Sequence, residues 1–380
     1  KITMNVLFPL VGDSVGGSHW SVINLFKELQ KKQSINPKIV LHVSNGKLSK
    51  HLDDMNIPYD VFHFKTLAGQ NSNLISILFF MLYHAYSIVK YIKSNDVDIV
   101  HGNDLRINLT WSLPVKLSSA KYIWHQRTHL SNSVKWKAIR YLANHVVSIS
   151  SYVHNSLPSN LTKEMKSHIK NPFDIKITYN KKKARRDINI NYPFLKDVFL
   201  IGYVGRLVPW KRVENILYAL QEINPRVNKE CNIYFVIVGE GEKRYTDKIN
   251  SLIKSLKLSD YVSTLGFFRR PSKLLSALDL LITSSHNEPF GRVVIESMIQ
   301  KTPVLASKSG GHIETIIHNK TGLLYNEDQS SNSLSRYIYS IAMGGVDTMP
   351  IVDFAYSKVI VEYSATNHAN KIIDIYKGLF

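Results

Sequence analysis

The segment from His286 to Glu296 combines two carboxylates with the residues of a tight turn. Glu288 and Glu296 stand eight positions apart, with a proline and a glycine between them. The apolar run Asp279 to Thr283 comes just before, which predicts a strand, then a loop holding Glu288, then a helix with Glu296 about one turn from its start. A helix start offers unpaired N–H groups and the positive end of the helix dipole, which suits a phosphate. The segment therefore predicts two hydroxyl-binding carboxylates around an anion site, as a nucleotide sugar requires.

Two cations follow another apolar run. Phe199 to Gly205 is predicted to be a strand, and Arg206 and Lys211 lie just after it, where the next helix begins. Two positive side chains in this place can neutralise a diphosphate, and arginine offers a planar fork that matches phosphate oxygens. The alternative is that the pair is only the solvated basic start of a helix.

The first strand and the first helix are joined by a glycine-rich turn. Residues 12–18 read Gly-Asp-Ser-Val-Gly-Gly-Ser. Glycine lets the backbone approach a ligand closely, although a simple connecting turn has a similar composition. His101 and His125 each end a predicted strand, and open α/β sheets bind ligands at the carboxyl ends of their strands. A lone histidine is also common in cores and on surfaces, so both interpretations stay open for these two.

Hydrophobic patterning predicts the elements that must position these residues. The predicted strands are short, apolar and rich in β-branched residues, as a parallel sheet buried on both faces requires. Their regular alternation with helices predicts doubly wound α/β sheets. The predicted strands are residues 2–8, 38–43, 98–101, 122–125, 146–149, 199–205, 233–238, 262–266, 280–283 and 303–306, and the predicted helices are residues 18–31, 74–93, 107–117, 134–143, 212–222, 243–256, 271–278, 293–300 and 313–318.

The alternation breaks around Asn171 to Asp174, and the chain is then polar and strongly basic up to Lys196. Two domains are therefore expected, with a cleft between the carboxyl ends of their sheets where ligands bind. The predicted divisions are an N-terminal Rossmann-like domain over 1–174, a basic linker over 175–197, a second Rossmann-like domain over 198–350, and a helical segment over 351–380 that crosses back to the first domain.

The motifs, taken in order, resemble those of the retaining nucleotide-sugar glycosyltransferases of the GT-B fold, glycosyltransferase family four, also called group 1. The order and spacing of the motifs are specific, although each alone is not. The resemblance covers nearly the whole chain and rests on Gly205-Arg206 with Lys211, Glu288 to Glu296, Ser309-Gly310-Gly311 with Glu314, and Thr321 to Leu324. It implies transfer of a sugar from a nucleoside-diphosphate sugar, with UDP preferred over GDP, to an acceptor hydroxyl on the N-terminal domain.

The resemblance also implies roles for individual residues. Glu288, His125, Arg206 and Lys211 are expected to be catalytic. The expected donor-binding residues are Gly16, Gly17, Arg206, Lys211, Phe267, Phe268, Glu288, Phe290, Gly291, Arg292 and Glu296, and the residues that line the acceptor side are Asn103, Asp104, Arg127 and His129. In the family the two cations do the work of a metal. No Asp-x-Asp cluster appears where a catalytic metal would be expected, so neither a metal nor another cofactor is expected.

The composition is globular but strongly basic. Lys and Arg number 48 against 29 Asp and Glu, a formal net charge of +19, which attracts polyanions of any kind. No familiar RNA- or DNA-binding motif accompanies this charge, so nucleic acid is not expected as a partner. The single cysteine, Cys231, excludes an intramolecular disulfide framework and favours the cytoplasm, and no secretory signal is visible.

Residues 74–92 form the most apolar segment of the chain. Its strongly apolar run is interrupted and falls short of the ~20 residues that span a bilayer, so an amphipathic helix is expected, either packed in a core or facing a membrane. The second interpretation, with the positive charge, implies peripheral contact with anionic lipid on the cytoplasmic face of the inner membrane. A glycan or lipid-linked glycan acceptor would then fit the assembly of bacterial lipopolysaccharide, O antigen, capsule or another surface polysaccharide.

Two other functions fit parts of the sequence. A GT-B enzyme of another reaction, such as a sugar-nucleotide epimerase or a glycogen-type synthase, shares the fold. An epimerase, however, needs additional acid and base groups around the sugar. A non-catalytic polyanion-binding protein would keep the charge but would not need Arg206, Lys211 and the two glutamates together.

Overall fold

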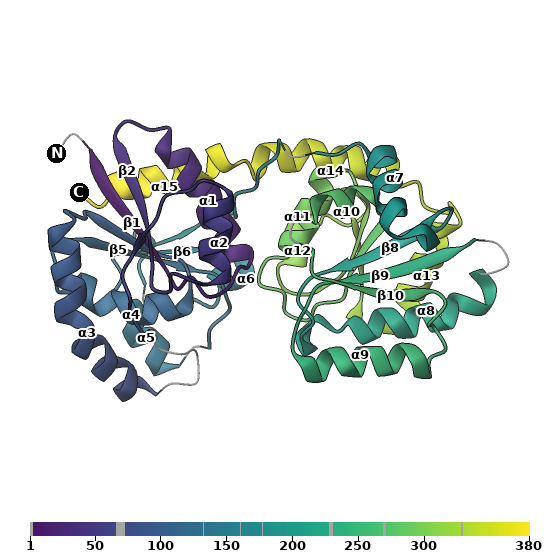
Figure 1. The fold of residues 1–380 in the computed structure, drawn as a ribbon, viewed down its shortest axis with the longest axis horizontal. Helices are drawn as coiled ribbons and strands as arrows, with labels where there is room; N and C mark the ends of the chain where they lie inside the picture. The colour runs from purple at the N-terminus through teal and green to yellow at the C-terminus, as the bar shows by residue number, and fades with distance from the viewer. Residues whose placement is uncertain are drawn as a thin grey trace. The chain divides into compact units, whose positions relative to one another are not determined.

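The computed structural model describes residues 3–65, 73–131, 133–159, 161–176, 178–227, 231–268, 271–327 and 330–380 of the chain. The chain divides into two compact units, whose elements are labelled in Figure 1. Unit 1 contains Lys1–Asp174 and Tyr363–Phe380, and unit 2 contains Ile175–Glu362. Each unit is built around its own parallel sheet.

The sheet of unit 1 has seven strands in the order β3-β2-β1-β4-β5-β6-β7. Every neighbouring pair is parallel, so all the carboxyl ends lie along one edge. The order reverses between β1 and β4, and that switch point is where open α/β sheets bind ligands. The strands are β1 (Met4–Leu10), β2 (Ile35–Leu41), β3 (Asp60–Val61), β4 (Ile99–Gly102), β5 (Lys121–Gln126), β6 (His145–Ser148) and β7 (Lys166–His168).

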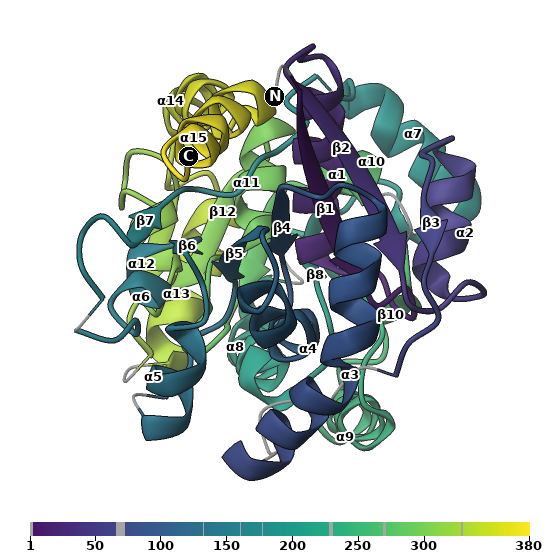
Figure 2. The same ribbon diagram turned by 90° about the vertical axis from the view of Figure 1, so that its left-hand side faces the viewer.

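Helices cover both faces of this sheet, which explains why its strands are apolar throughout. Leu7 of β1 packs into the core with α3 and α4, whereas Val6 and Phe8 pack into the core with α1 and α15. Figure 2 shows these helices around the sheet of unit 1. The helices are α1 (Gly17–Gln30), α2 (Lys47–Asp54), α3 (Leu74–Ser94), α4 (Leu105–Lys116), α5 (Val134–Arg140), α6 (Ser151–His154) and the C-terminal α15 (Ala365–Lys377).

Unit 2 repeats the arrangement with six parallel strands in the order β10-β9-β8-β11-β12-β13, and its switch point lies between β8 and β11. The strands are β8 (Phe199–Val204), β9 (Ile233–Val238), β10 (Val262–Gly266), β11 (Leu280–Thr283), β12 (Val304–Ser307) and β13 (Leu323–Tyr325). The helices are α7 (Lys181–Asn191), α8 (Val213–Val227), α9 (Lys243–Ser255), α10 (Ser272–Ala277), α11 (Arg292–Ile299), α12 (His312–Thr315), α13 (Ser330–Ala342) and α14 (Met349–Glu362), with short 3-10 turns η1 (Pro193–Leu195) and η2 (Pro209–Lys211).

The predicted α/β class with two doubly wound parallel sheets is confirmed. Strands β9, β10 and β11 begin and end at the predicted residues. Three edge strands, β3, β7 and β13, were not predicted, because two or three residues are too short to show a period. Neither were the helices α2, α6, α7 and α13.

The basic segment 175–197 was expected to be a linker, but it carries α7, which packs against α10 of unit 2. Lys181 and Arg185, one helical turn apart, both reach the carboxylate of Asp279, at 2.9 and 3.1 Å. Arg185 also donates to the carbonyl of Ala277 at 2.6 Å. Part of the basic segment therefore forms ion pairs and hydrogen bonds within unit 2. Likewise, residues 351–362 of the predicted C-terminal segment lie in unit 2, and only 363–380 belong to unit 1.

Helix α3 is apolar on two faces. The face that includes Met81 is buried in the core of unit 1. The other face exposes aromatic rings, with Phe79 71%, Tyr83 74% and Tyr86 78% exposed. The 21-residue helix is long and apolar enough to cross a membrane, so the expectation that the segment is too short was wrong. Core helices of water-soluble proteins can meet the same criterion of length and composition.

Candidate active site

The switch point of unit 2 holds a buried ion pair between two of the predicted residues. Lys211 Nζ lies 2.6 Å from Glu288 Oε2, and the two side chains are 13% and 9% exposed. Lys211 comes from η2, after β8, and Glu288 from the loop after β11. The sheet order makes β8 and β11 neighbours, so the topology itself brings these two residues together.

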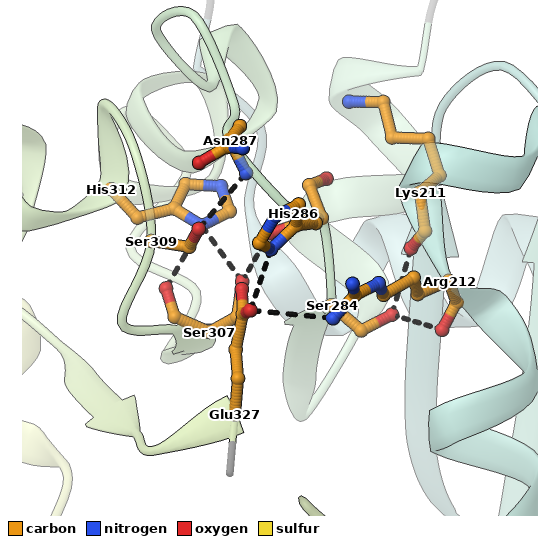
Figure 3. A network of polar contacts seen from close by, with 10 residues as sticks. Lys211, Arg212, Ser284, His286, Asn287, Ser307, Ser309, His312 and Glu327 are labelled. Carbon is orange, nitrogen blue, oxygen red and sulfur yellow. Dashed lines mark hydrogen bonds and ion pairs between the residues drawn. The ribbon is translucent and has the colours of Figure 1, made fainter. Parts of the chain in front are cut away.

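Hydrogen bonds fix the two loops to each other. The Ser284 hydroxyl donates to the carbonyls of Lys211 and Arg212, at 2.9 and 2.7 Å (Figure 3). The His286 N–H donates to the Trp210 carbonyl at 2.8 Å. The Lys211 ammonium also lies 4.3 Å from the centre of the Trp210 ring, a cation–π contact. The ion pair is therefore held by its backbone as well as by its own charges.

The pKa of Glu288 is below its ordinary value. Burial acts to raise it, but the charge of Lys211 and the hydrogen bonds to the carboxylate outweigh burial. Glu288 is therefore a carboxylate at neutral pH, and its oxygens can accept hydrogen bonds from hydroxyl groups.

Three glycines shape the loop that carries Glu288. Gly291 has φ +85°, and a Cβ there would lie 2.9 Å from the His312 ring. Gly310 has φ +53°, and a Cβ on Gly311 would lie 2.7 Å from the Cα of Phe290. The Gly311 N–H donates to the Glu288 carbonyl at 2.6 Å. The glycines are thus required by positive φ and by close packing.

His312 is a residue of this site that sequence reasoning missed. It is fully buried, its Nδ1 lies 3.1 Å from the Ser307 carbonyl, and burial lowers its pKa. A carbonyl can only accept, so Nδ1 carries the proton and Nε2 is an acceptor, which has no hydrogen-bond partner among the described residues. The sequence feature that could have indicated this residue is its position directly after the glycine pair at 310–311.

Other predicted donor-site residues lie at several positions of unit 2. Glu296 lies one turn into α11, where its carboxylate pairs with Arg292 at 3.4 Å. The residue expected to hold the ribose is therefore in contact with a residue expected to face the phosphates. Arg206 is exposed just after β8. Phe290 is buried, whereas Phe267 is 61% exposed after β10, and Phe268 lies against Tyr192.

Glu327 is a second residue that sequence reasoning missed. Its carboxylate accepts from His286 Nδ1 at 2.7 Å and from Arg212 at 3.3 Å (Figure 3). Its other oxygen, Oε1, is buried and has no hydrogen-bond partner in the described part of the chain. Glu327 follows β13, an edge strand that was not predicted, so nothing in the pattern marked it.

The switch point of unit 1 collects a second cluster of predicted residues. The guanidinium of Arg127, just after β5, donates at 2.6 Å to the side-chain oxygens of Asn103 and Asn171. Asn103 also donates to the carbonyl of His101 at 3.0 Å. His101 Nε2 and His125 Nδ1 are 3.1 Å apart and both rings are buried. Burial first, then the charge of Arg127, lowers the pKa of both histidines well below the ordinary value, so both are neutral.

A histidine side chain stabilises the glycine-rich turn through a hydrogen bond. Gly16 caps α1, and its N–H donates to His19 Nδ1 at 2.9 Å. Burial, with the charge of Arg127, lowers the pKa of His19 to about 4. Gly17 is the first residue of α1. The Asp13 carboxylate in the same turn accepts hydrogen bonds from the two terminal guanidinium nitrogens of Arg106, at 2.6 and 2.9 Å.

Two of the residues predicted to line the acceptor side make local contacts in unit 1. Asp104 caps α4, where its side chain accepts from the Ile107 N–H at 2.9 Å. His129 is exposed and stacks on Tyr152 with 5.0 Å between ring centres. Across the ranges that the structure describes, no three His, Cys, Asp or Glu side chains are grouped to hold a metal ion.

A solved structure shares the whole fold. HepE from Anabaena, in complex with UDP and glucose, matches 98% of this chain and 99% of that chain with a TM-score of 0.83 at 21% sequence identity. At this identity the likeness shows the fold, and the two parallel α/β units with this neighbour define it as GT-B. The predicted fold is confirmed.

Residues 185–343 match the family model of the glycosyl transferases group 1. An uncharacterized glycosyltransferase of Methanocaldococcus jannaschii is 30% identical over 54% of this chain and 50% of its own length. The poly(ribitol-phosphate) alpha-N-acetylglucosaminyltransferase of Staphylococcus aureus is 27% identical over 57% of this chain and 43% of its own length. The matches thus span about half of these curated relatives.

Proposed function

We propose that the protein is a glycosyltransferase that moves a sugar from a nucleoside-diphosphate sugar to an acceptor hydroxyl with retention of anomeric configuration. The observation that carries this is the buried Lys211–Glu288 pair at the switch point of unit 2, inside the group 1 region. It puts one cation and one hydroxyl-accepting carboxylate at the place where α/β sheets bind nucleotides. UDP is the preferred nucleotide of the donor, as in the ligand of HepE, and GDP is the second candidate.

In this mechanism the bond between the sugar's anomeric carbon and the phosphate oxygen breaks, and a bond to the acceptor oxygen forms. Lys211, Arg206 and the N–H groups at the start of α11 stabilise the charge of the departing diphosphate, so this site needs no metal. Glu288 holds the sugar's hydroxyls, and Glu296 accepts from the ribose once the donor draws it from Arg292. The leaving phosphate takes the acceptor's proton on the same face.

Unit 1 supplies the other predicted contacts. His125 touches the donor sugar, and Arg127 and Asn103 line the acceptor side, where the amide oxygens hold the guanidinium in one orientation. A surface polysaccharide or lipopolysaccharide intermediate is the proposed acceptor. The Staphylococcus aureus relative, by its name a poly(ribitol-phosphate) alpha-N-acetylglucosaminyltransferase, supports a surface polysaccharide.

The exposed face of α3 supports contact with an anionic membrane, and hence a lipid-linked acceptor at the cytoplasmic face. Its aromatic rings suit the bilayer interface, and the net charge of +19 favours anionic lipid. Sedimentation with phosphatidylglycerol vesicles tests this. Serine at Phe79, Tyr83 and Tyr86 is expected to abolish binding, whereas serine at the exposed Phe354, Val361 and Phe380 is not. Equal binding by both triple variants, or none by the native protein, would remove α3 as a membrane face.

The donor site is tested by thermal shift with UDP, GDP, ADP and their sugars, first without added metal and then with EDTA. A ligand that binds the folded state raises the melting temperature. We expect a shift with one nucleotide that EDTA does not change and that Glu296→Ala or Arg206→Ala removes. A shift only with nucleic acid or anionic lipid would favour a polyanion-binding protein instead, and a donor shift without transfer to any acceptor, but with a changed sugar, would favour an epimerase.

A further inference from the structure

The C-terminal helix connects to the predicted active-site histidine through a line of buried polar atoms. α15 packs against α1 in unit 1 (Figure 1). Its Tyr376 hydroxyl lies 2.8 Å from His101 Nδ1, and His101 Nε2 lies 3.1 Å from His125 Nδ1. The two histidine rings are nearly parallel, at 12°, and all three side chains are at most 1% exposed. His125 Nε2, at the end of the line, has no hydrogen-bond partner among the described residues.

Counting protons selects one arrangement of this line. If the Tyr376 O–H donates to His101 Nδ1, then His101 carries its proton on Nε2 and donates to His125 Nδ1. His125 then carries its proton on Nε2, and this N–H is the single unsatisfied group. In the reverse arrangement Tyr376 accepts, its own proton is left without an acceptor, and the His125 Nε2 lone pair is unsatisfied as well. Each buried unsatisfied group costs ~1–3 kcal/mol, so the first arrangement is favoured.

The surroundings keep the rings neutral, as this count assumes. Arg127 faces both histidines, His368 of α15 stacks on His125 with 6.1 Å between ring centres, and His145 lies near His101. Burial first, and then the charge of Arg127, lower the pKa of His101 and His125. Burial raises the pKa of Tyr376, so the phenol keeps the proton that it donates.

We infer that Tyr376 and His101 are positioning residues that hold His125 as the Nε2–H tautomer, so that His125 presents a neutral hydrogen-bond donor at the carboxyl end of β5. The inference rests on the proposed function for its ligand, which is an oxygen of the transferred sugar. A neutral donor suits a hydroxyl oxygen, because it binds that oxygen without adding a charge to a buried site.

Side-chain nitrogen NMR of protein labelled with ¹⁵N-histidine tests the tautomer without any substrate. The His125 signals are assigned as those lost in His125→Asn. The expected result is a protonated Nε2 in the native protein, and in Tyr376→Phe a mixture of both tautomers of His101 and His125. Tyr122→Phe is the matched control, since it removes another buried phenol of unit 1, which donates to Asn108 at 2.6 Å. A native spectrum with the His125 proton on Nδ1 would overturn the inference even if Tyr376→Phe failed to fold.

Kinetics then separates this inference from the proposed function. With the donor and acceptor that the native enzyme uses, Tyr376→Phe is expected to lower kcat about tenfold, the effect of ~1.4 kcal/mol, with the affinity for the nucleotide unchanged. Tyr122→Phe should keep the native kcat. An Nε2–H tautomer in a protein without transferase activity would refute the function and leave the positioning line intact. Full activity in Tyr376→Phe would refute the line alone.

Discussion

Lys211→Met should destabilise unit 2, because it leaves a buried carboxylate without its cation. Lys211 Nζ lies 2.6 Å from Glu288 Oε2, and both side chains are about a tenth exposed. Removing one partner of a buried ion pair costs ~3–5 kcal/mol, because the other charge stays buried. Here a hydrogen bond from Ser285 also favours the Glu288 carboxylate and remains in the variant. We therefore expect a loss of ~2–3 kcal/mol in the free energy of unfolding.

The assay must report on unit 2 alone, since a chain of two units need not unfold in one step. Urea unfolding followed by hydrogen exchange of peptides from α11 and β12 meets this need. Lys181→Met is the matched control: it removes a lysine that pairs with Asp279 at 2.9 Å in the same unit, but with 47% of its side chain exposed. An exposed pair of this kind contributes under ~1 kcal/mol.

A double variant tests the cause of the effect. Glu288→Gln removes the charge that Lys211→Met leaves unpaired, so the double variant should recover part of the lost stability, with a coupling of ~1–2 kcal/mol. If Lys211→Met costs no more than Lys181→Met, or if the double variant is as unstable as the sum of the single ones, the pair does not stabilise the site in the way the geometry indicates.

Three further changes have expected outcomes. Gly291→Ala should lower the free energy of unfolding of unit 2 by ~1–2 kcal/mol for the positive φ alone and should weaken nucleotide binding, whereas Gly344→Ala, also at positive φ but with open space around it, should leave binding unchanged. Because the pKa of buried His19 is lowered from 6.5 to about 4, unit 1 is expected to keep its full stability above pH 6.5 and to lose it as the pH falls toward 4, and calorimetry of His19→Gln should show a smaller pH dependence. Glu327→Gln should change stability by under ~1 kcal/mol, because Arg212 and His286 are 38% and 42% exposed, so any larger loss in a urea titration contradicts the assignment of its partners.

The strands of the two sheets, and the candidate site residues that follow them, could be predicted from the sequence. Uninterrupted, β-branched apolar runs such as residues 233–238 are typical of strands in a sheet buried on both faces, and the positions of the residues after β8 and β11 follow from that assignment. What it could not predict depends on contacts between distant segments. Lys181 and Arg185 look like a solvated run until Asp279 is placed beside them. Glu327 and His312 join the site only because β12 pairs with β11 and β13 pairs with β12.

The two switch points differ in how their charges are arranged, which agrees with different roles for the two units. In unit 2 a buried cation and carboxylate neutralise each other, and in the proposed function an incoming diphosphate shares Lys211 while the sugar's hydroxyls donate to Glu288. In unit 1 the histidines stay neutral and the one cation of the cluster, Arg127, is oriented by two amide oxygens. Neutral donors and acceptors of fixed direction discriminate between hydroxyl positions without attracting charge, because a misplaced hydroxyl leaves a buried polar atom unpaired at ~1–3 kcal/mol. On this reasoning, the proposed affinity for the donor resides mainly in the ion pair of unit 2, and the neutral histidines of unit 1 supply hydrogen bonds of fixed direction.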